Sequence, residues 1–171
     1  MADGSNEAQG SPFWHFSLGY YRKRGVADAC IALQDDYGVD VNLLLFLLWL
    51  ASLERRITLA ELTSLSDTVR GWQAGVIAPL RDLRRKLKHA PPLVEAGAAE
   101  LFRTKVKGLE LEAERLQQQA MFELSRRAPL GEAADSVAGA ARANVAALQN
   151  LMGRGFPIPT VDALIAALKD A

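Results

Sequence analysis

A cluster of oxygen-bearing side chains lies directly before the most apolar stretch of the sequence. Its members are Gln34, Asp35, Asp36, Asp40 and Asn42. Asp36 and Asp40 are four residues apart, so one continuous helix would place both carboxylates on the same face. Carboxylates arranged in this way bind Mg²⁺, and through the metal they hold diphosphate groups. A magnesium or diphosphate site is therefore one interpretation of the cluster.

Turn and cap chemistry is the other interpretation. Gly38 separates the two aspartates and suits the left-handed conformation that follows the last turn of a helix. Asp40 would then cap the next helix by accepting hydrogen bonds from its free backbone N–H groups. The Asn42 amide, in the first turn of that helix, would bond local backbone groups, a neighbouring helix or a ligand. The sequence leaves these alternatives open.

Basic residues gather in a second stretch of the chain. They are Arg81, Arg84, Arg85, Lys86 and Lys88. Such a stretch can bind phosphate, but the lack of interleaved aromatic residues and the formal net charge of zero argue against nucleic acid as a partner. Residues 106–115 are rich in glutamate and offer these cations a second set of partners within the chain.

A helical hairpin would bring these opposite charges together. Apolar residues at spacings of three and four predict helices over residues 59–89 and 98–127, and the short connection predicts that they run antiparallel. The guanidinium fork of arginine suits bidentate contact with carboxylates. The expected structural charge network comprises Arg81, Arg84, Glu110, Glu112, Glu114 and Arg115. No metal is predicted there, because the histidines of two-metal helical bundles are missing three residues after the glutamates.

Local signals refine both helices of this hairpin. Thr58 and Glu61 fit a capping box at the start of the first helix, and Pro79 predicts a kink about one turn before it. In the second helix, apolar residues alternate at spacings of four and three, which predicts a seam buried against the first helix. These seam residues are Phe102, Val106, Leu109, Ala113, Leu116 and Ala120.

The core forms around residues 41–53, which read Val-Asn-Leu-Leu-Leu-Phe-Leu-Leu-Trp-Leu-Ala-Ser-Leu. A helix of this length rises only about 20 Å, which is short of the roughly 30 Å of a bilayer core. Because it has no polar face, other elements must cover it on every side. We therefore expect an all-α, single-domain bundle of about seven helices around a buried central helix.

An aromatic-rich helix after Pro12 is expected to seal one end of this core. It also offers an alternative, in which an apolar small molecule is held between this helix and the central one, near Asn42, Trp49 and Trp72. The lone cysteine, Cys30, lies in an apolar run and is expected to be a buried, inert thiol.

The domain organisation follows from composition and breaker residues. Residues 1–11 are polar and are expected to form a disordered tail before a single domain over residues 12–171. Residues 132–171 read as a C-terminal helical extension, with an alanine-rich helix from residue 132 and a short amphipathic helix capped by Thr160. That last helix either docks on the domain or forms a dimer contact.

Three blocks of the sequence resemble the signature blocks of a small bacterial family catalogued only as a domain of unknown function. The first is Ala-Leu-Gln-Asp-Asp-Tyr-Gly-Val-Asp-Val-Asn-Leu-Leu-Leu-Phe-Leu-Leu-Trp at residues 32–49, and the last is Val-Lys-Gly-Leu-Glu-Leu-Glu-Ala-Glu-Arg at 106–115. Between them, the middle block comprises Trp72, Val76, Pro79, Leu80, Arg81, Arg84 and Arg85. The resemblance covers roughly residues 13–125 and implies no particular activity.

A much weaker likeness is to the helical squalene and phytoene synthases, in which two aspartate-rich motifs face one another across an apolar tunnel. Asp36 and Asp40 resemble one such motif, but only Glu110 and Glu114 could stand for the second.

The sequence thus favours a cytoplasmic, non-catalytic domain that binds another protein or a second copy of itself, with no nucleic-acid partner, membrane span or cofactor. The alternatives are a carrier or sensor of an apolar small molecule and a metal-dependent enzyme acting on an isoprenoid or phosphorylated substrate. The candidate ligand-binding residues are Asp35, Asp36, Asp40, Asn42, Trp49, Trp72, Arg81 and Arg84.

Overall fold

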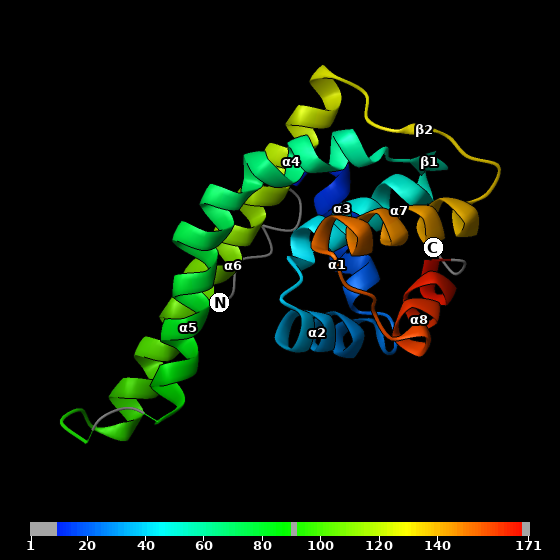
Figure 1. Ribbon diagram of the computed structural model, residues 1–171. Coiled ribbons are helices and arrows are strands. Elements are labelled where there is room, and N and C mark those ends of the chain that lie inside the picture. The colour runs from blue at the N-terminus through cyan, green and yellow to red at the C-terminus, as the bar shows by residue number, and fades with distance from the viewer. Residues whose placement is uncertain (1–9, 90–91, 169–171) are drawn as a thin grey trace. The chain divides into compact units, whose positions relative to one another are not determined.

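The computed structural model describes residues 10–89 and 92–168, and its fold is all-α, as predicted (Figure 1). The helices are α1 (Pro12–Tyr21), α2 (Val26–Tyr37), α3 (Val41–Ser52), α4 (Leu59–Trp72), α5 (Ala78–Lys86), α6 (Ala96–Arg127), α7 (Val137–Met152) and α8 (Ile158–Leu168). A π-helical turn, Gln73–Ile77, joins α4 to α5, and a 3₁₀ turn, Leu87–His89, follows α5. None of the described helices combines the length and apolarity needed to cross a membrane.

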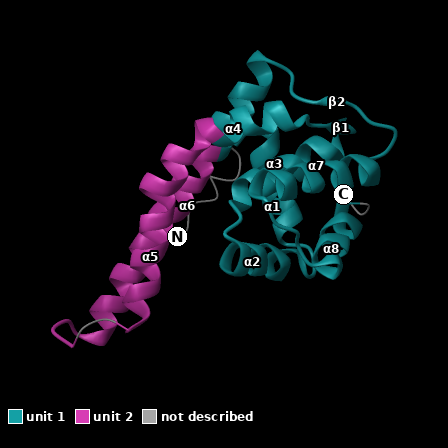
Figure 2. Ribbon diagram, viewed as in Figure 1, with its two compact units in different colours: residues 1–66, 118–171 teal, residues 67–117 magenta. Residues whose placement is uncertain are grey.

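The chain divides into two compact units (Figure 2). The core unit contains residues 1–66 and 118–171, and the hairpin unit contains residues 67–117. Helices α4 and α6 each contribute residues to both units. The single domain expected over residues 12–171 stays a prediction, and residues 1–9 of the expected tail lie outside the described part. Ser11, which was also assigned to that tail, is instead buried and caps α1 through the Trp14 backbone N–H.

Helix α3 is the centre of the core unit, as its composition predicts. Its ten consecutive residues from Asn42 to Ala51 are all buried, and helices α1, α2 and α7 pack around it. The Asp40 carboxylate starts the helix by accepting hydrogen bonds from the backbone N–H groups of Asn42 (2.9 Å) and Leu43 (3.2 Å). Burial raises the pKa of the Cys30 thiol to about 12, so this cysteine is protonated and unreactive at neutral pH.

The core unit contains a short antiparallel ladder, one strand of which lies where the sequence predicted the start of the alanine-rich helix. Strand β1 (Arg55–Arg56) pairs with β2 (Glu132–Ala133), so the alanine-rich helix begins at Val137, capped by Ser136. The Arg55 side chain donates to the carbonyl oxygen of Leu130 (2.7 Å) and to that of Gly131. Alanine composition predicted the helix, but these long-range bonds hold the first residues of that segment in an extended form.

The last helix docks on the core unit. Helix α8 packs on α2 and α7, and its apolar residues Leu164, Ile165 and Leu168 are buried. The Tyr20 hydroxyl donates to the carbonyl oxygen of Leu164 (2.5 Å), which ties α8 to α1. The predicted cap at Thr160 is wrong, because the helix already begins at Ile158.

The hairpin unit consists of the end of α4, the π-helical turn, α5 and the first part of α6. Proline at position 79 has no backbone N–H, and the π-helical turn lies directly before it, at the place of the predicted kink. The wider turn rotates the residues that follow it by about the angle of one extra residue. Ile77, the last residue of the turn, is buried, whereas Leu83 in α5 is exposed.

Candidate functional site

The aspartate cluster forms caps and turns in the core unit. Asp35 and Asp36 lie in the last turn of α2, Gly38 takes a left-handed conformation (φ 71°), and Asp40 caps α3. The two carboxylates of the expected diphosphate motif therefore lie on different elements. The guanidinium of Arg154 covers the end of α2, donating to the carbonyl oxygen of Tyr37 (3.0 Å). Within residues 10–89 and 92–168, no three histidine, cysteine or acidic side chains are grouped to hold a metal ion.

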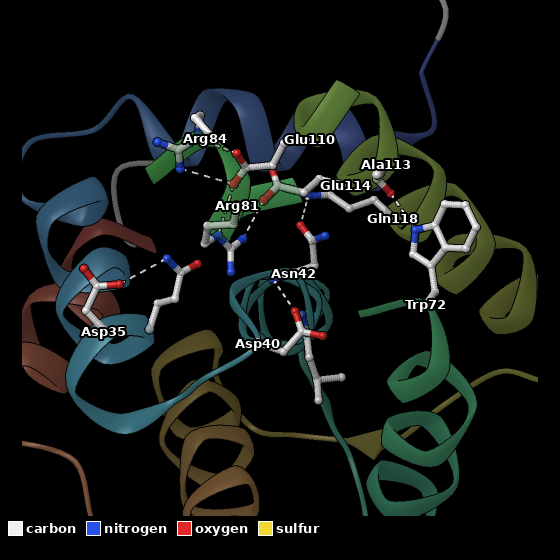
Figure 3. Close-up of polar contacts among 12 residues, drawn as sticks. Asp35, Asp40, Asn42, Trp72, Arg81, Arg84, Glu110, Ala113, Glu114 and Gln118 are labelled. Carbon is white, nitrogen blue, oxygen red and sulfur yellow. Dashed lines mark hydrogen bonds and ion pairs between the residues drawn. The ribbon is translucent and has the colours of Figure 1, made fainter. Parts of the chain in front are cut away.

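Asn42 and Trp49 contribute to the interior of the core unit. The side-chain oxygen of Asn42 accepts a hydrogen bond from Gln118 Nε2 (2.8 Å), and both residues are buried (Figure 3). The Trp49 ring is enclosed by three phenylalanines, with centroid distances of 5.5 Å to Phe13, 5.4 Å to Phe46 and 5.8 Å to Phe122. These contacts give both residues structural roles.

The charges of the hairpin unit meet between its two helices (Figure 3). Arg81 donates from Nε to Glu110 Oε1 (3.1 Å) and from Nη2 to Glu114 Oε1 (2.9 Å). Arg84 donates from Nε to Glu110 Oε2 (2.5 Å). Burial alone would raise the pKa of Glu110, but the hydrogen bonds and charges of Arg84 and Arg81 outweigh it and hold the pKa below its usual value.

Two residues of the expected network pair separately. Arg115 donates to Glu112 along the same helix, at 2.9 Å and 2.7 Å. The hydrogen bonds between the two helices join Arg81 and Arg84 to Glu110 and Glu114, and we call these residues the four-residue charge network. Asp35, Asp36, Asp40, Asn42 and Trp49 belong to the core unit, whereas Trp72, Arg81 and Arg84 belong to the hairpin unit.

Charged side chains occupy the space between the two helices of the hairpin unit, and several of its apolar side chains are exposed. Within the hairpin unit, the buried residues of α6 are Ala99, Val106, Glu110, Ala113 and Gln117. Four members of the predicted apolar seam remain exposed, namely Ala120 and three large residues: Phe102 at 53 %, Leu109 at 59 % and Leu116 at 43 %. The three large residues are seven residues apart, so they form one stripe along α6. We call Phe102, Leu109 and Leu116 the apolar stripe.

The other helix adds to the same face of the hairpin unit. Leu109 is rotated by roughly 50° from the buried line through Val106 and Ala113, and Trp72 by roughly 60° from Val69. Both rotations have the same sense when each helix is viewed along its own chain direction. Because the two helices run antiparallel, Leu109 and Trp72 therefore lie on the same side of the hairpin unit. Trp72 is 41 % exposed, and its Nε1 donates to the carbonyl oxygen of Ala113 (2.9 Å), which holds the ring against α6 (Figure 3).

The apolar stripe was missed by sequence reasoning, which assigned its residues to the buried seam. The signal that could have found it is Glu110, a carboxylate that must be buried if it pairs with both Arg81 and Arg84. A helix that turns Glu110 inward turns Leu109 outward, because consecutive residues differ by about 100° around the axis.

The family comparison agrees with the three sequence blocks. Residues 12–121 match the model of a protein family of unknown function, DUF2390. The chain belongs to this family. The match covers α1 to α5 and most of α6, so the matched segment contains the residues of the four-residue charge network and of the apolar stripe. No curated protein and no solved structure matches the chain, and the likeness to squalene and phytoene synthases finds no support.

Proposed function

We propose that this DUF2390 protein is a non-catalytic interaction domain and that the apolar face of its hairpin unit binds another protein. The observation that carries the proposal is the apolar stripe. Scattered exposed leucines are common on protein surfaces, but three large apolar residues in one line, beside an exposed tryptophan, are typical of a helix that packs on a partner. A cytoplasmic location is part of the same proposal.

The charge network supports this proposal through the geometry of the hairpin unit. Guanidinium and carboxylate groups occupy the space between the helices, where a two-helix hairpin would otherwise bury its large apolar residues. The stripe then has little opportunity for burial within its own unit. Burying a leucine or phenylalanine side chain contributes about 1.5–3 kcal/mol, so a partner that covers the stripe gains a substantial free energy.

The two alternative functions have less support. A carrier of an apolar molecule needs space near Trp49, and three phenylalanine rings already contact that side chain. A metal-dependent enzyme needs Asp36 and Asp40 together, and the carboxylate of Asp40 is engaged at the start of α3.

Site-specific photo-crosslinking in the cells that produce the protein tests the proposal. A photoreactive phenylalanine derivative replaces Leu109 in one variant and Leu111 in another. The two positions are matched, since both are leucines of α6 with similar exposure, 59 % and 50 %, on opposite faces of the helix. We expect discrete protein adducts from position 109 and none from position 111. Equal labelling at both positions, or no adduct at either, would overturn the proposal.

A further inference from the structure

We propose that the apolar stripe binds the same stripe of a second copy of this chain, with the two α6 helices antiparallel and a two-fold axis passing beside Leu109. This inference rests on the proposed function and names the partner. The area available suits it, because two helices about 10 Å wide and about 21 Å of stripe give a face at the small end of specific interfaces. The expected dimer is therefore reversible, with a dissociation constant in the micromolar range.

The positions along the stripe are symmetric about Leu109. Phe102 lies seven residues before it and Leu116 seven residues after it. In an antiparallel pair centred on Leu109, Phe102 of one copy meets Leu116 of the other, and Leu109 meets its own counterpart. A two-fold interface is self-complementary in this way, since each contact occurs twice. An unrelated partner would not require this symmetry.

Two charges of opposite sign lie beside the stripe at nearly equal distances from Leu109, and one of them, Glu112, also pairs with Arg115 of its own helix. Lys105 lies four residues before Leu109 and Glu112 three residues after it. Both are displaced from the stripe by roughly 40–60° toward the outer side of α6. Around the proposed axis, Lys105 of one copy comes opposite Glu112 of the other, and symmetry makes this pair twice. Like charges at these positions would repel, so the arrangement selects the antiparallel register.

The dimer also gives the hairpin unit an apolar interior, which its two helices alone largely lack. Its described buried apolar side chains are few: Val69, Ile77, Ala99, Val106 and Ala113. Two such hairpins face to face form a four-helix arrangement, in which Trp72 and the apolar stripe of each copy line a shared interior.

Sedimentation equilibrium of the full-length chain over a range of concentrations tests the inference. We expect a reversible monomer–dimer equilibrium in the unmodified protein. Leu109→Glu places two carboxylates at the axis and should weaken the dimer at least about 100-fold, whereas the matched variant Leu111→Glu leaves it unchanged. A monomer at all concentrations, or equal effects of the two variants, would overturn the inference.

Charge reversal tests the register without touching the apolar residues. Lys105→Glu and Glu112→Lys should each weaken the dimer about tenfold, because each creates two like-charged pairs. The double variant should restore it, and so should mixing the two single variants, which forms a heterodimer with opposite charges paired. Failure of the double variant and of the mixture to restore association would rule out this register. Circular dichroism checks that each variant keeps its helix content.

Crosslinking separates this inference from the proposed function. An adduct at position 109 with twice the chain's 18.6 kDa supports self-association. An adduct of any other mass, with a monomer in sedimentation, would keep the interaction domain and overturn the second copy as its partner.

Discussion

The side chain of Asn144 forms hydrogen bonds to three residues that are distant in the sequence. This residue of α7 is fully buried, and its Oδ1 accepts from the backbone N–H of Ile57 (2.8 Å). Its Nδ2 donates to the carbonyl oxygens of Leu47 (2.9 Å) and Arg55 (3.0 Å). One amide thus links α7 to α3, to the first residue of β1 and to the residue that follows β1. Buried backbone groups need such partners, because an unpaired one costs free energy.

Replacing Asn144 should therefore destabilise the core unit strongly. Asn144→Ala removes all three hydrogen bonds and leaves the buried N–H of Ile57 without this partner, and we expect a loss of about 3 kcal/mol in the free energy of unfolding, measured by urea denaturation. Asn150→Ala is the matched control, since this asparagine lies on the exposed side of the same helix, and its loss should stay within about 0.5 kcal/mol. A similar small loss in both variants would contradict the structural role of Asn144.

At the scale of elements, the charge network joins α5 to α6 and makes the hairpin unit sensitive to acid. Glu110 accepts from two arginines, and its side chain is 7 % exposed. Its pKa is held below the ordinary 4.5 in the folded state, so folding favours the carboxylate form. A group of this kind stabilises the folded state fully above its unfolded pKa, and the stabilisation is lost as pH falls through the folded pKa.

Glu110→Gln should remove this acid dependence. At pH 7 the variant leaves Arg81 and Arg84 partly buried without their shared charge partner, and we expect a loss of about 2 kcal/mol or more in stability of the hairpin unit. The difference from the unmodified protein should begin to shrink below pH 4.5, where Glu110 becomes protonated in the unfolded chain, and shrink further as pH passes the lower pKa of the folded state. Hydrogen exchange of residues 78–86 measures it. Asp67→Asn, which affects the exposed Asp67–Arg70 pair of the same unit, is the control and should show little change.

Local signals predicted the elements well, because caps and breakers act over a few residues. Asp40 caps α3, Gly38 ends α2, and Glu61 accepts from the Thr58 backbone N–H (2.8 Å), all as the sequence indicates. The segment at Glu132 was predicted as helix but forms a strand that pairs with Arg56. Local sequence patterns could not indicate this pairing, because Arg56 is 76 residues away. Leu109 was assigned to the buried seam, because apolar spacing carries no information about which neighbours compete for the same space.

At the scale of the whole molecule, the two units differ in how their residues are buried. The core unit surrounds ten consecutive buried residues of α3 with three other helices. The hairpin unit buries few apolar side chains and fills part of its interior with ions and amides. Ion pairs contribute less net stability than apolar burial, because charges lose solvation when they are buried. The hairpin unit is therefore the part of the molecule expected to open first.

Hydrogen exchange should resolve this difference. At low protein concentration, we expect amides of residues 98–116 to exchange at least about 100-fold faster than those of residues 44–51, because local opening needs less free energy than global unfolding. Raising the concentration should slow exchange in residues 98–116 alone, since the bound state covers the apolar stripe and binding stabilises what it contacts. Leu109→Glu should abolish that concentration dependence and leave residues 44–51 unchanged. Uniform protection along the chain, independent of concentration, would show that the two units unfold as one.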